Sequence, residues 1–405
     1  MIDIILLAVA GVGAGIITGL IPGVHPNTLA VFLLSVSGAM LAVFSLHAVV
    51  VFMVSMAITH SFLSFIPSVF IGAPEGGTAL SVLPGHRLLL EGLGYEAVYL
   101  TVVGGLGVVM LSVLLLPLLM VALPVFYSAI RGYIAFVLLG IAAVMVGTER
   151  GRKKALGLGV FLMAGVLGII VLNMPIVAGQ FLLFPVFTGL FGISTLAISF
   201  LSGIRVPEQK MGRVRVPRGT SVAGIVKGFM SGMVVGILPG IGAAQAGVLV
   251  HHLTGRKGLR EFLVALGGIN TVAALFSLMA LYLISRPRSG VAVAVSKLME
   301  GFGFPDLLLL IAAALFAAGI AAVVTLRLTR VFAGFIQRVS YKKLSSTVIC
   351  FLVGLVVLFT GLPGLLLLGA STSIGLLPPL LGVKRTHCMS VLMSPIIIWY
   401  LGIVV

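Results

Sequence analysis

Long apolar runs broken by short polar stretches dominate the chain. No Asp, Glu, Lys or Arg occurs between Asp3 and Glu75. Four further uncharged stretches are long enough to cross a bilayer: 97–130, 155–204, 344–383 and 386–405. A transmembrane helix needs about 20 apolar residues, so these runs have room for about 10–12 transmembrane or re-entrant helices. The pattern predicts an all-α, polytopic integral membrane protein.

Composition and charge agree with this class. Hydrophobic residues make up 60% of the 405 positions and charged residues 8%. The net charge is +16, but the basic residues gather in short segments between apolar runs, such as 149–154 and 204–218. Loops of this kind usually lie at the cytoplasmic face against anionic lipid headgroups. We therefore expect a multi-pass protein of the plasma membrane, with membrane lipids as partners and no nucleic acid.

Two apolar runs contain the same interruption, Gly-x-x-Pro-Gly, at 19–23 and 236–240. Proline blocks helix continuation, and freed backbone groups are costly in hydrocarbon unless they line a cavity inside the protein. Lys227 is expected at a membrane interface, and Pro239 lies about 18 Å further along a helix. That spacing favours a break inside the bilayer. The alternative is a surface turn between two ordinary spans.

Other segments follow the two interruptions in the same order, which predicts an internal repeat. Aligning Pro22 with Pro239 also pairs several glycines and later segments: Gly15 with Gly232, Gly19 with Gly236, Gly23 with Gly240, 88–100 with 297–309, and 187–194 with 371–378. We predict two membrane halves, 1–204 and 220–405, joined by a basic linker at 205–219. Secondary transporters are often built this way, with the site where the halves meet. An inverted relationship is favoured, although basic segments at corresponding places in the halves fit a parallel one.

A helix that begins inside the membrane after each break would present unpaired N–H groups and a positive dipole end, which suit an anion. The candidate substrate-binding residues at the two breaks are Pro22, Gly23, His25, Asn27, Thr28, Pro239, Gly240, Gly242 and Gln245. An equally simple interpretation is that Asn27 and Thr28 only cap their own helix.

Further polar residues within apolar segments are candidates for the same site. His60, Asn270 and Thr271 either face a substrate pathway or join helices by hydrogen bonds. Arg288 and Ser289 lie in a segment aligned with the one that carries Glu75. Arginine suits a carboxylate or phosphate substrate, and a carboxylate suits coupling to Na⁺ or H⁺. The alternative is that Glu75 and Arg288 are ordinary loop charges.

Signatures of catalysis and of metal binding are missing from the sequence. No Walker-type phosphate loop, nucleophile elbow or set of ligands at zinc spacing occurs. We therefore predict a protein that is not an enzyme and that has no metal or cofactor besides a coupling ion.

Several stretches resemble the large membrane subunit of tripartite tricarboxylate transporters. They are GLIPGVHPNTLAVFLL (19–34), GILPGIGAAQAGVLV (236–250), residues 70–100 and FPVFTGLFGISTL (184–196). In that family this subunit forms an ion-driven path for carboxylates and works with a small membrane subunit and an extracytoplasmic binding protein. The resemblance implies that Pro22, Gly23, Pro239 and Gly240 shape the substrate site here.

The sequence leaves other functions open. The paired Pro-Gly elements also resemble those of polyprenyl-phosphate translocases, whose lipid phosphate would use the same helix-end chemistry. A membrane scaffold without transport is a rival class, and a homo-oligomer is left open. The function that we expect is secondary transport of an organic anion, a carboxylate, coupled to Na⁺ or H⁺. Because the chain lacks a Walker loop, we do not expect ATP to be the energy source.

Overall fold

The structure is a computed structural model of the 405-residue chain. It describes residues 1–21, 26–72, 82–173, 181–202, 207–212, 214–238, 242–243, 246–247, 258–336 and 340–403. Within these ranges the regular structure is helical, and nine helical stretches are long and apolar enough to cross a membrane. The prediction of an all-α polytopic membrane protein is confirmed.

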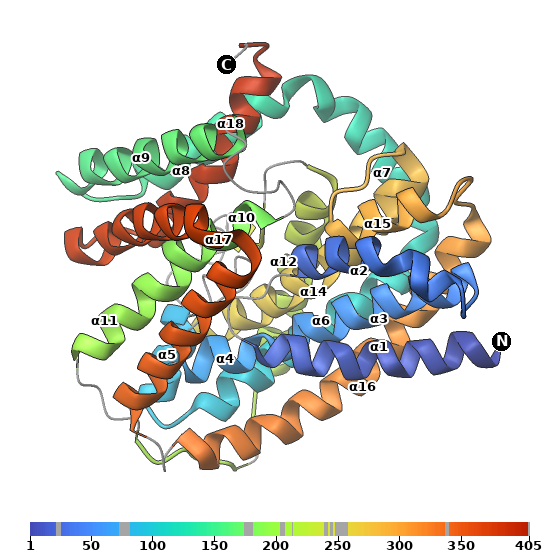
Figure 1. Ribbon diagram of the computed structural model, residues 1–405, viewed down its shortest axis with the longest axis horizontal. Coiled ribbons are helices and arrows are strands. Elements are labelled where there is room, and N and C mark those ends of the chain that lie inside the picture. The colour runs from blue at the N-terminus through green and yellow to red at the C-terminus, as the bar shows by residue number, and fades with distance from the viewer. Residues whose placement is uncertain are drawn as a thin grey trace.

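The helices fall into two groups in Figure 1. The first group holds α1 (Ile2–Leu20), α2 (Pro26–Leu41), α3 (Leu46–Leu63), α4 (Phe65–Phe70), α5 (Val82–Leu90), α6 (Gly94–Leu114), α7 (Leu116–Ile130), α12 (Arg218–Ile237), α14 (Leu259–Ile284), α15 (Gly290–Leu298) and α16 (Phe304–Ile336). The second group holds α8 (Ile134–Gly147), α9 (Lys153–Asn173), α10 (Leu183–Phe187), the π-helical turn η4 (Thr188–Ile193), α11 (Ser194–Ser202), α17 (Tyr341–Leu381), the 3₁₀ turn η6 (Arg385–Met389) and α18 (Ser390–Tyr400). A 3₁₀ turn, η2 (Arg131–Tyr133), joins α7 to α8.

Glycines at every fourth position join α1 to α3 and α12 to α14. Added side chains at Gly11, Gly15 and Gly19 would meet α3, and added side chains at Gly228, Gly232 and Gly236 would meet α14. Without side chains on these faces, the backbones approach closely enough for direct packing, which is how small residues join helices in membranes. The same pattern therefore builds the same helix pair in both parts of the chain.

Helices α3 and α14 form the centre of the first group. They are the most buried of the candidate membrane helices, and in Figure 1 they lie behind α1 and α2. Helix α16 packs on α3, and α6 packs on α14. Each central helix therefore pairs with a helix from the other part of the chain, and the two parts are interlocked.

Polar contacts at the helix ends fix the directions of these helices. His47 Nε2 lies 3.0 Å from Asp306 Oδ1, so α3 and α16 begin at the same end of the group. Glu96 pairs with Arg260, so α6 and α14 begin together. Arg330, near the far end of α16, stacks on Tyr95 at the start of α6, so these starts lie at the opposite end. Helices α3 and α14 are therefore antiparallel.

The distance between these two ends matches a bilayer. From Asp306 to Arg330 the helix α16 rises about 36 Å, and the uncharged stretch between Asp306 and Arg327 covers about 30 Å, the thickness of the hydrocarbon core. Large apolar side chains are exposed along the outer helices, among them Leu118 and Leu366. Exposed apolar surface of this extent is suited to lipid contact.

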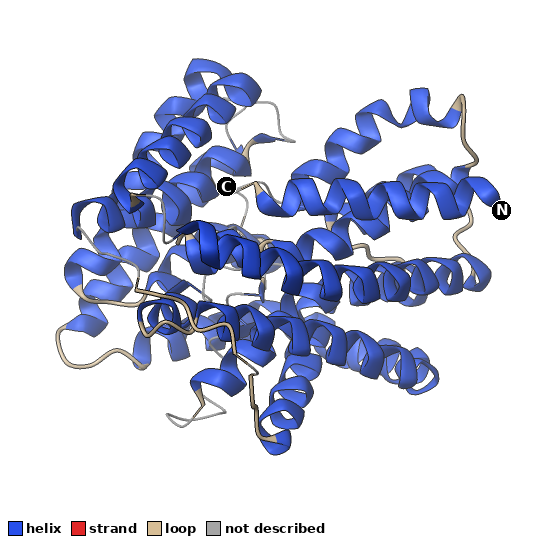
Figure 2. Cartoon of the chain, turned by 90° about the horizontal axis from the view of Figure 1, so that it is seen from below, coloured by secondary structure: helices blue, strands red, loops and turns tan. Residues whose placement is uncertain are grey.

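The second group contains the longest helix of the described chain. Helix α17 covers 41 residues, but Gly361 has φ 64° and ψ −163°, a conformation that favours glycine, and the helix bends there. Two segments that the sequence alignment matched pack on each other: Gly189 of η4 contacts Ser371, and Gly375 contacts Leu190. The view from below in Figure 2 shows helices throughout both groups.

The described part of the linker is docked on the first half. Gln209 accepts a hydrogen bond from the N–H of Gly94 at 2.9 Å and donates to the carbonyl of Leu89 at 3.0 Å. The N–H of Lys210 donates to the carbonyl of Gly92 at 2.7 Å. The chain therefore holds the turn between α5 and α6 before it enters α12.

Candidate functional site

Both helices that lead into the Pro-Gly elements end just before the proline. Helix α1 ends at Leu20, and Ile21 is extended with ψ 113°. Helix α12 ends at Ile237, and Leu238 is extended with ψ 131°. A residue before proline is forced out of the helical region by the proline ring. Ile237 and Leu238 are buried, so the second break lies inside the protein.

A helix resumes soon after each break. Helix α2 begins at Pro26, a residue well suited to the first turn of a helix. After the second break, the N–H of Ala246 donates to the carbonyl of Gly242 at 3.2 Å, as in a helical turn. Several predicted site residues lie outside the described residues: Pro22, Gly23, His25, Glu75, Pro239, Gly240 and Gln245, together with the side chains of Asn27 and Thr28.

Helices α1 and α12 approach the middle of the first group from its opposite ends before each of them stops. Gly19 lies beside Leu63, about 24 Å along α3 from His47. Gly236 lies beside Phe276, about 24 Å along α14 from Arg260. Because α3 and α14 are antiparallel and the ends are about 36 Å apart, each broken helix passes the middle before it stops.

Polar side chains join α3 to α14 at their crossing. Ser61 donates to Thr271 Oγ1 at 3.3 Å, and Asn270 donates from Nδ2 to the carbonyl of Ser61 at 3.2 Å. Thr271 is buried, and Asn270 is partly exposed. The residue before Ser61 on α3 is His60, and its Nδ1 lies 3.2 Å from Thr18 Oγ1 on α1. The structure thus brings Ser61, Asn270 and Thr271 together and turns His60 toward α1.

Arg288 lies at the end of the second broken helix. Its Nε donates to the carbonyl of Ile237 at 3.0 Å. Its backbone N–H donates to Ser277 Oγ at 2.7 Å, and that of Ser289 donates to the same oxygen at 2.6 Å. Ser289 in turn caps α15 by accepting from the N–H of Ala292 at 3.2 Å. The loop after α14 is therefore folded back so that Arg288 reaches the break.

One nitrogen of the Arg288 guanidinium group has no hydrogen-bond partner among the described residues. Nη2 is buried and has no hydrogen-bond partner within the described part of the chain. A buried unpaired N–H of a charged group is costly, and a bound carboxylate or phosphate would satisfy it. One nitrogen of Arg288 therefore contacts the end of α12, and another has no partner among the described residues.

The sequence analysis missed two polar residues that position this site. Thr18 is one turn before the first break and contacts His60. Ser277 lies almost two turns after Thr271 on α14 and orients Arg288 and Ser289. Both are hydroxyls in apolar helices close to a chosen residue, which is a signal that could have found them.

Metal binding finds no support where the structure can be described. Within those ranges, no group of three or more His, Cys, Asp or Glu side chains is placed to hold a metal ion. Titratable residues instead form pairs, the most buried of which is Glu149 with His387.

Broken helices that meet around a buried polar crossing occur in many secondary transporters. Residues 5–390 match the Tripartite tricarboxylate transporter TctA family. The chain belongs to this family. Its membership agrees with the resemblance drawn from the sequence and with the prediction of a permease, and it places the chain among transporters.

The chain is also similar to uncharacterized protein MJ1079 of Methanocaldococcus jannaschii. The two are 32% identical over 413 aligned positions, which cover 98% of this chain and 99% of the relative. No solved structure matches the chain.

Proposed function

We propose that this protein is a secondary transporter of a small organic carboxylate and that Arg288 binds the carboxylate group. The observation that carries the proposal is the buried Nη2 of Arg288 beside the broken end of α12. Family membership supports a tricarboxylate permease as the class. The substrate would lie between the two breaks, where helices resume and their N-terminal N–H groups attract an anion.

The two halves are proposed to be inverted repeats. The glycine pattern that joins α1 to α3 recurs between α12 and α14, and the two pairs run in opposite directions. An inverted repeat brings one broken helix to the centre from each face. Asn27 and Thr28 would serve the first break, and Gly242 and Gln245 the second, with Ser61 and Thr271 at the crossing.

We also propose a cellular setting, which family membership supports. The partners would be a small membrane subunit and an extracytoplasmic binding protein, and the location would be the plasma membrane. An ion gradient, of Na⁺ or H⁺, would drive uptake. Glu75 remains the sequence-based candidate for the coupling site.

Ligand-induced stabilisation of the purified protein tests the proposal. A bound ligand adds RT ln(1 + [L]/Kd), or about 2.7 kcal/mol at 100 Kd. Citrate, malate and succinate are compared with a soluble polyprenyl-phosphate analogue, each with and without Na⁺. Stabilisation by a carboxylate that the Arg288→Lys variant loses supports the proposal. Stabilisation by the lipid phosphate alone, or by no ligand in a folded sample, would overturn it.

A second test addresses the breaks themselves. Valine at both Gly23 and Gly240 restricts the backbone at positions where glycine is suited to a break. Loss of uptake into proteoliposomes with retained folding is expected. Full activity of the double variant would rule out a role of these elements in the substrate site.

A further inference from the structure

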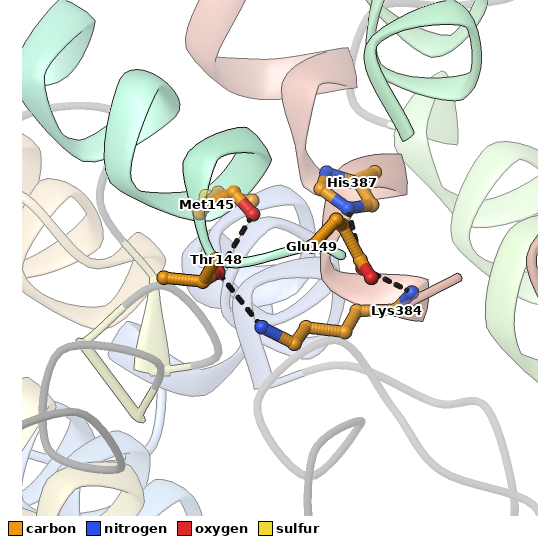
Figure 3. A network of polar contacts seen from close by, with 5 residues as sticks. All are labelled: Met145, Thr148, Glu149, Lys384 and His387. Atoms are coloured by element: carbon orange, nitrogen blue, oxygen red, sulfur yellow. Dashed lines mark hydrogen bonds and ion pairs between the residues drawn. The ribbon is translucent and has the colours of Figure 1, made fainter. Parts of the chain in front are cut away.

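A buried acid–base pair lies where α8 leads into α9 and α17 leads into α18. His387 Nε2 is 3.1 Å from Glu149 Oε1, and the same oxygen accepts from the N–H of Lys384 at 2.8 Å. His387 is completely buried and Glu149 is 8% exposed. Figure 3 shows both groups converging on one carboxylate oxygen from the segment before α18.

Glu149 is the only acid in this region of the sequence, and several cationic side chains lie near the pair. Glu149 is the only acidic residue between Glu96 and Glu208, and no acid follows Asp306. The charged or titratable groups that surround the pair are Lys153 of α9, which lies beside Gly382, and Lys384, Arg385 and Cys388 of the segment before α18. Lys384 Nζ donates to Thr148 at 2.7 Å, and Arg385 donates to Ser194 and Thr195. The side chains of Lys384 and Arg385 thus have other partners, and the side chain that contacts the Glu149 carboxylate is that of His387.

The imidazole has one nitrogen that is ready to accept a proton. With Nε2 donating to the carboxylate, the neutral ring carries its lone pair on Nδ1. Nδ1 is buried and has no partner among the described residues. Gly157 of α9 packs directly against the ring, which limits its movement. Proton uptake at Nδ1 converts the neutral imidazole beside the carboxylate, a pair of net charge −1, into an imidazolium–carboxylate ion pair of net charge zero, with no other bond made or broken.

The helices next to this pair also pack against described residues on either side of the second Pro-Gly element. Met145, one turn before Glu149, and Met393, after His387, belong to one apolar cluster with Leu238, Ala243 and Ala246. Leu238 and Ala243 flank Pro239 and Gly240. A change in how tightly Glu149 holds His387 therefore acts on the helices that pack against the break.

We propose that Glu149 and His387 form the proton site of the transporter, through which a pH gradient acts on the second Pro-Gly element. The proposal rests on the transport function above and names H⁺ as the coupling ion. Uptake would load His387 from the more acidic side, and release would follow when α8 and α18 change position. The site differs from Glu75, which the sequence suggested.

Proteoliposomes separate coupling from transport. Labelled citrate, malate or succinate is offered under a pH gradient, and exchange of the same substrate is measured without a gradient. The Glu149→Gln and His387→Gln variants should lose gradient-driven accumulation by about tenfold or more, while exchange stays within about twofold. His47→Gln is the matched control, because its pair with Asp306 has the same chemistry at an exposed position.

Failure of the proton site and failure of the transport function give different results. Gradient-driven accumulation that persists in both variants would overturn the proton site even where the protein transports the carboxylate. Failure of the wild-type protein to bind or exchange any of the three carboxylates would instead overturn the proposed function. In that case, nitrogen NMR of histidine-labelled protein tests the proton site. A titration at Nδ1 that disappears in His387→Gln and shifts in Glu149→Gln supports the proton site. Absence of this titration in the wild-type protein rejects the proton site. This measurement also decides the matter if one variant fails to fold.

Discussion

Nε of Arg288 donates a hydrogen bond to the carbonyl oxygen of Ile237 across 51 positions of sequence. In an unbroken helix this carbonyl would accept from the N–H four residues later. The proline at 239 ends the helix, so the carbonyl needs another partner, and Arg288 supplies it. The cost of the break is thus reduced by the same side chain that we propose to bind the substrate.

Replacement of Arg288 by lysine is expected to weaken carboxylate binding by about 10-fold to 100-fold, since a hydrogen bond to a charged group contributes about 1.5–3 kcal/mol. A lysine ammonium lacks the planar fork of the guanidinium group, so it cannot reproduce the geometry by which Arg288 contacts Ile237 and would bind a carboxylate. Thermal stabilisation by citrate, malate or succinate measures the loss. The neighbouring Arg286 is exposed, and its change to alanine should leave binding unaltered. Equal losses in both variants would argue against a specific role for Arg288.

Glycine at position 104 is required by the packing of α6 on α14. An added Cβ at Gly104 would clash with the carbonyl of Val264. Gly104→Ala should therefore destabilise the protein by about 1–3 kcal/mol, the usual cost of overpacking. Gly140 of α8 has open space around it, so Gly140→Ala should be neutral or slightly stabilising. Thermal unfolding in detergent compares the two, and a stable Gly104→Ala variant would contradict this packing.

The sequence predicted the class because it depends on local chemistry: uncharged runs define membrane helices. Proline disfavours helix continuation, and α1 and α12 do end before Pro22 and Pro239. Pro124 and Pro378 nevertheless lie inside helices, so a proline alone does not fix where a helix ends. Arg288 and Thr271 could be selected as candidate site residues because a polar side chain in an apolar segment usually has a structural or functional role.

The sequence could not predict contacts between distant segments. Nothing near Glu149 indicates that His387, 238 positions away, is its partner. The loop 149–154 was interpreted as a basic surface segment, but its first residue is buried in a pair. Likewise the linker was expected to be only a polar connection, whereas Gln209 is buried in the first half.

Acidification should lower the stability of the protein through its buried histidines. Burial lowers the pKa of His387 and of His86 below their ordinary value of 6.5. The unfolded chain then binds more protons than the folded one, so this stability is present above pH about 6.5 and is lost as the pH falls through the folded pKa. Thermal unfolding between pH 8 and pH 5 should show the fall. His387→Gln and His86→Gln should each flatten it, and an unchanged profile in both would refute this origin.

Removal of the Gln209 side chain should loosen the linker. Gln209→Ala leaves the buried N–H of Gly94 without its partner, at a cost of about 1–3 kcal/mol. It also removes one of two donors to the carbonyl of Leu89, which still accepts from the N–H of Gly92. Limited proteolysis of the segment between the halves is expected to become faster. Lys210→Ala is the control, because Lys210 binds Gly92 through its backbone. Similar cleavage rates for the wild type and both variants would mean that the linker is not held by Gln209.

The opposite directions of the α1–α3 and α12–α14 pairs have an energetic consequence. If the halves exchanged conformations, an opening toward one side of the membrane would become an opening toward the other, and the same backbone contacts would be reused. The inward-open and outward-open states would then differ in free energy only through side chains that the halves do not share, such as Arg288. Under this proposal, the residues that the halves do not share would set the resting orientation of the empty protein, and single substitutions among them would shift it.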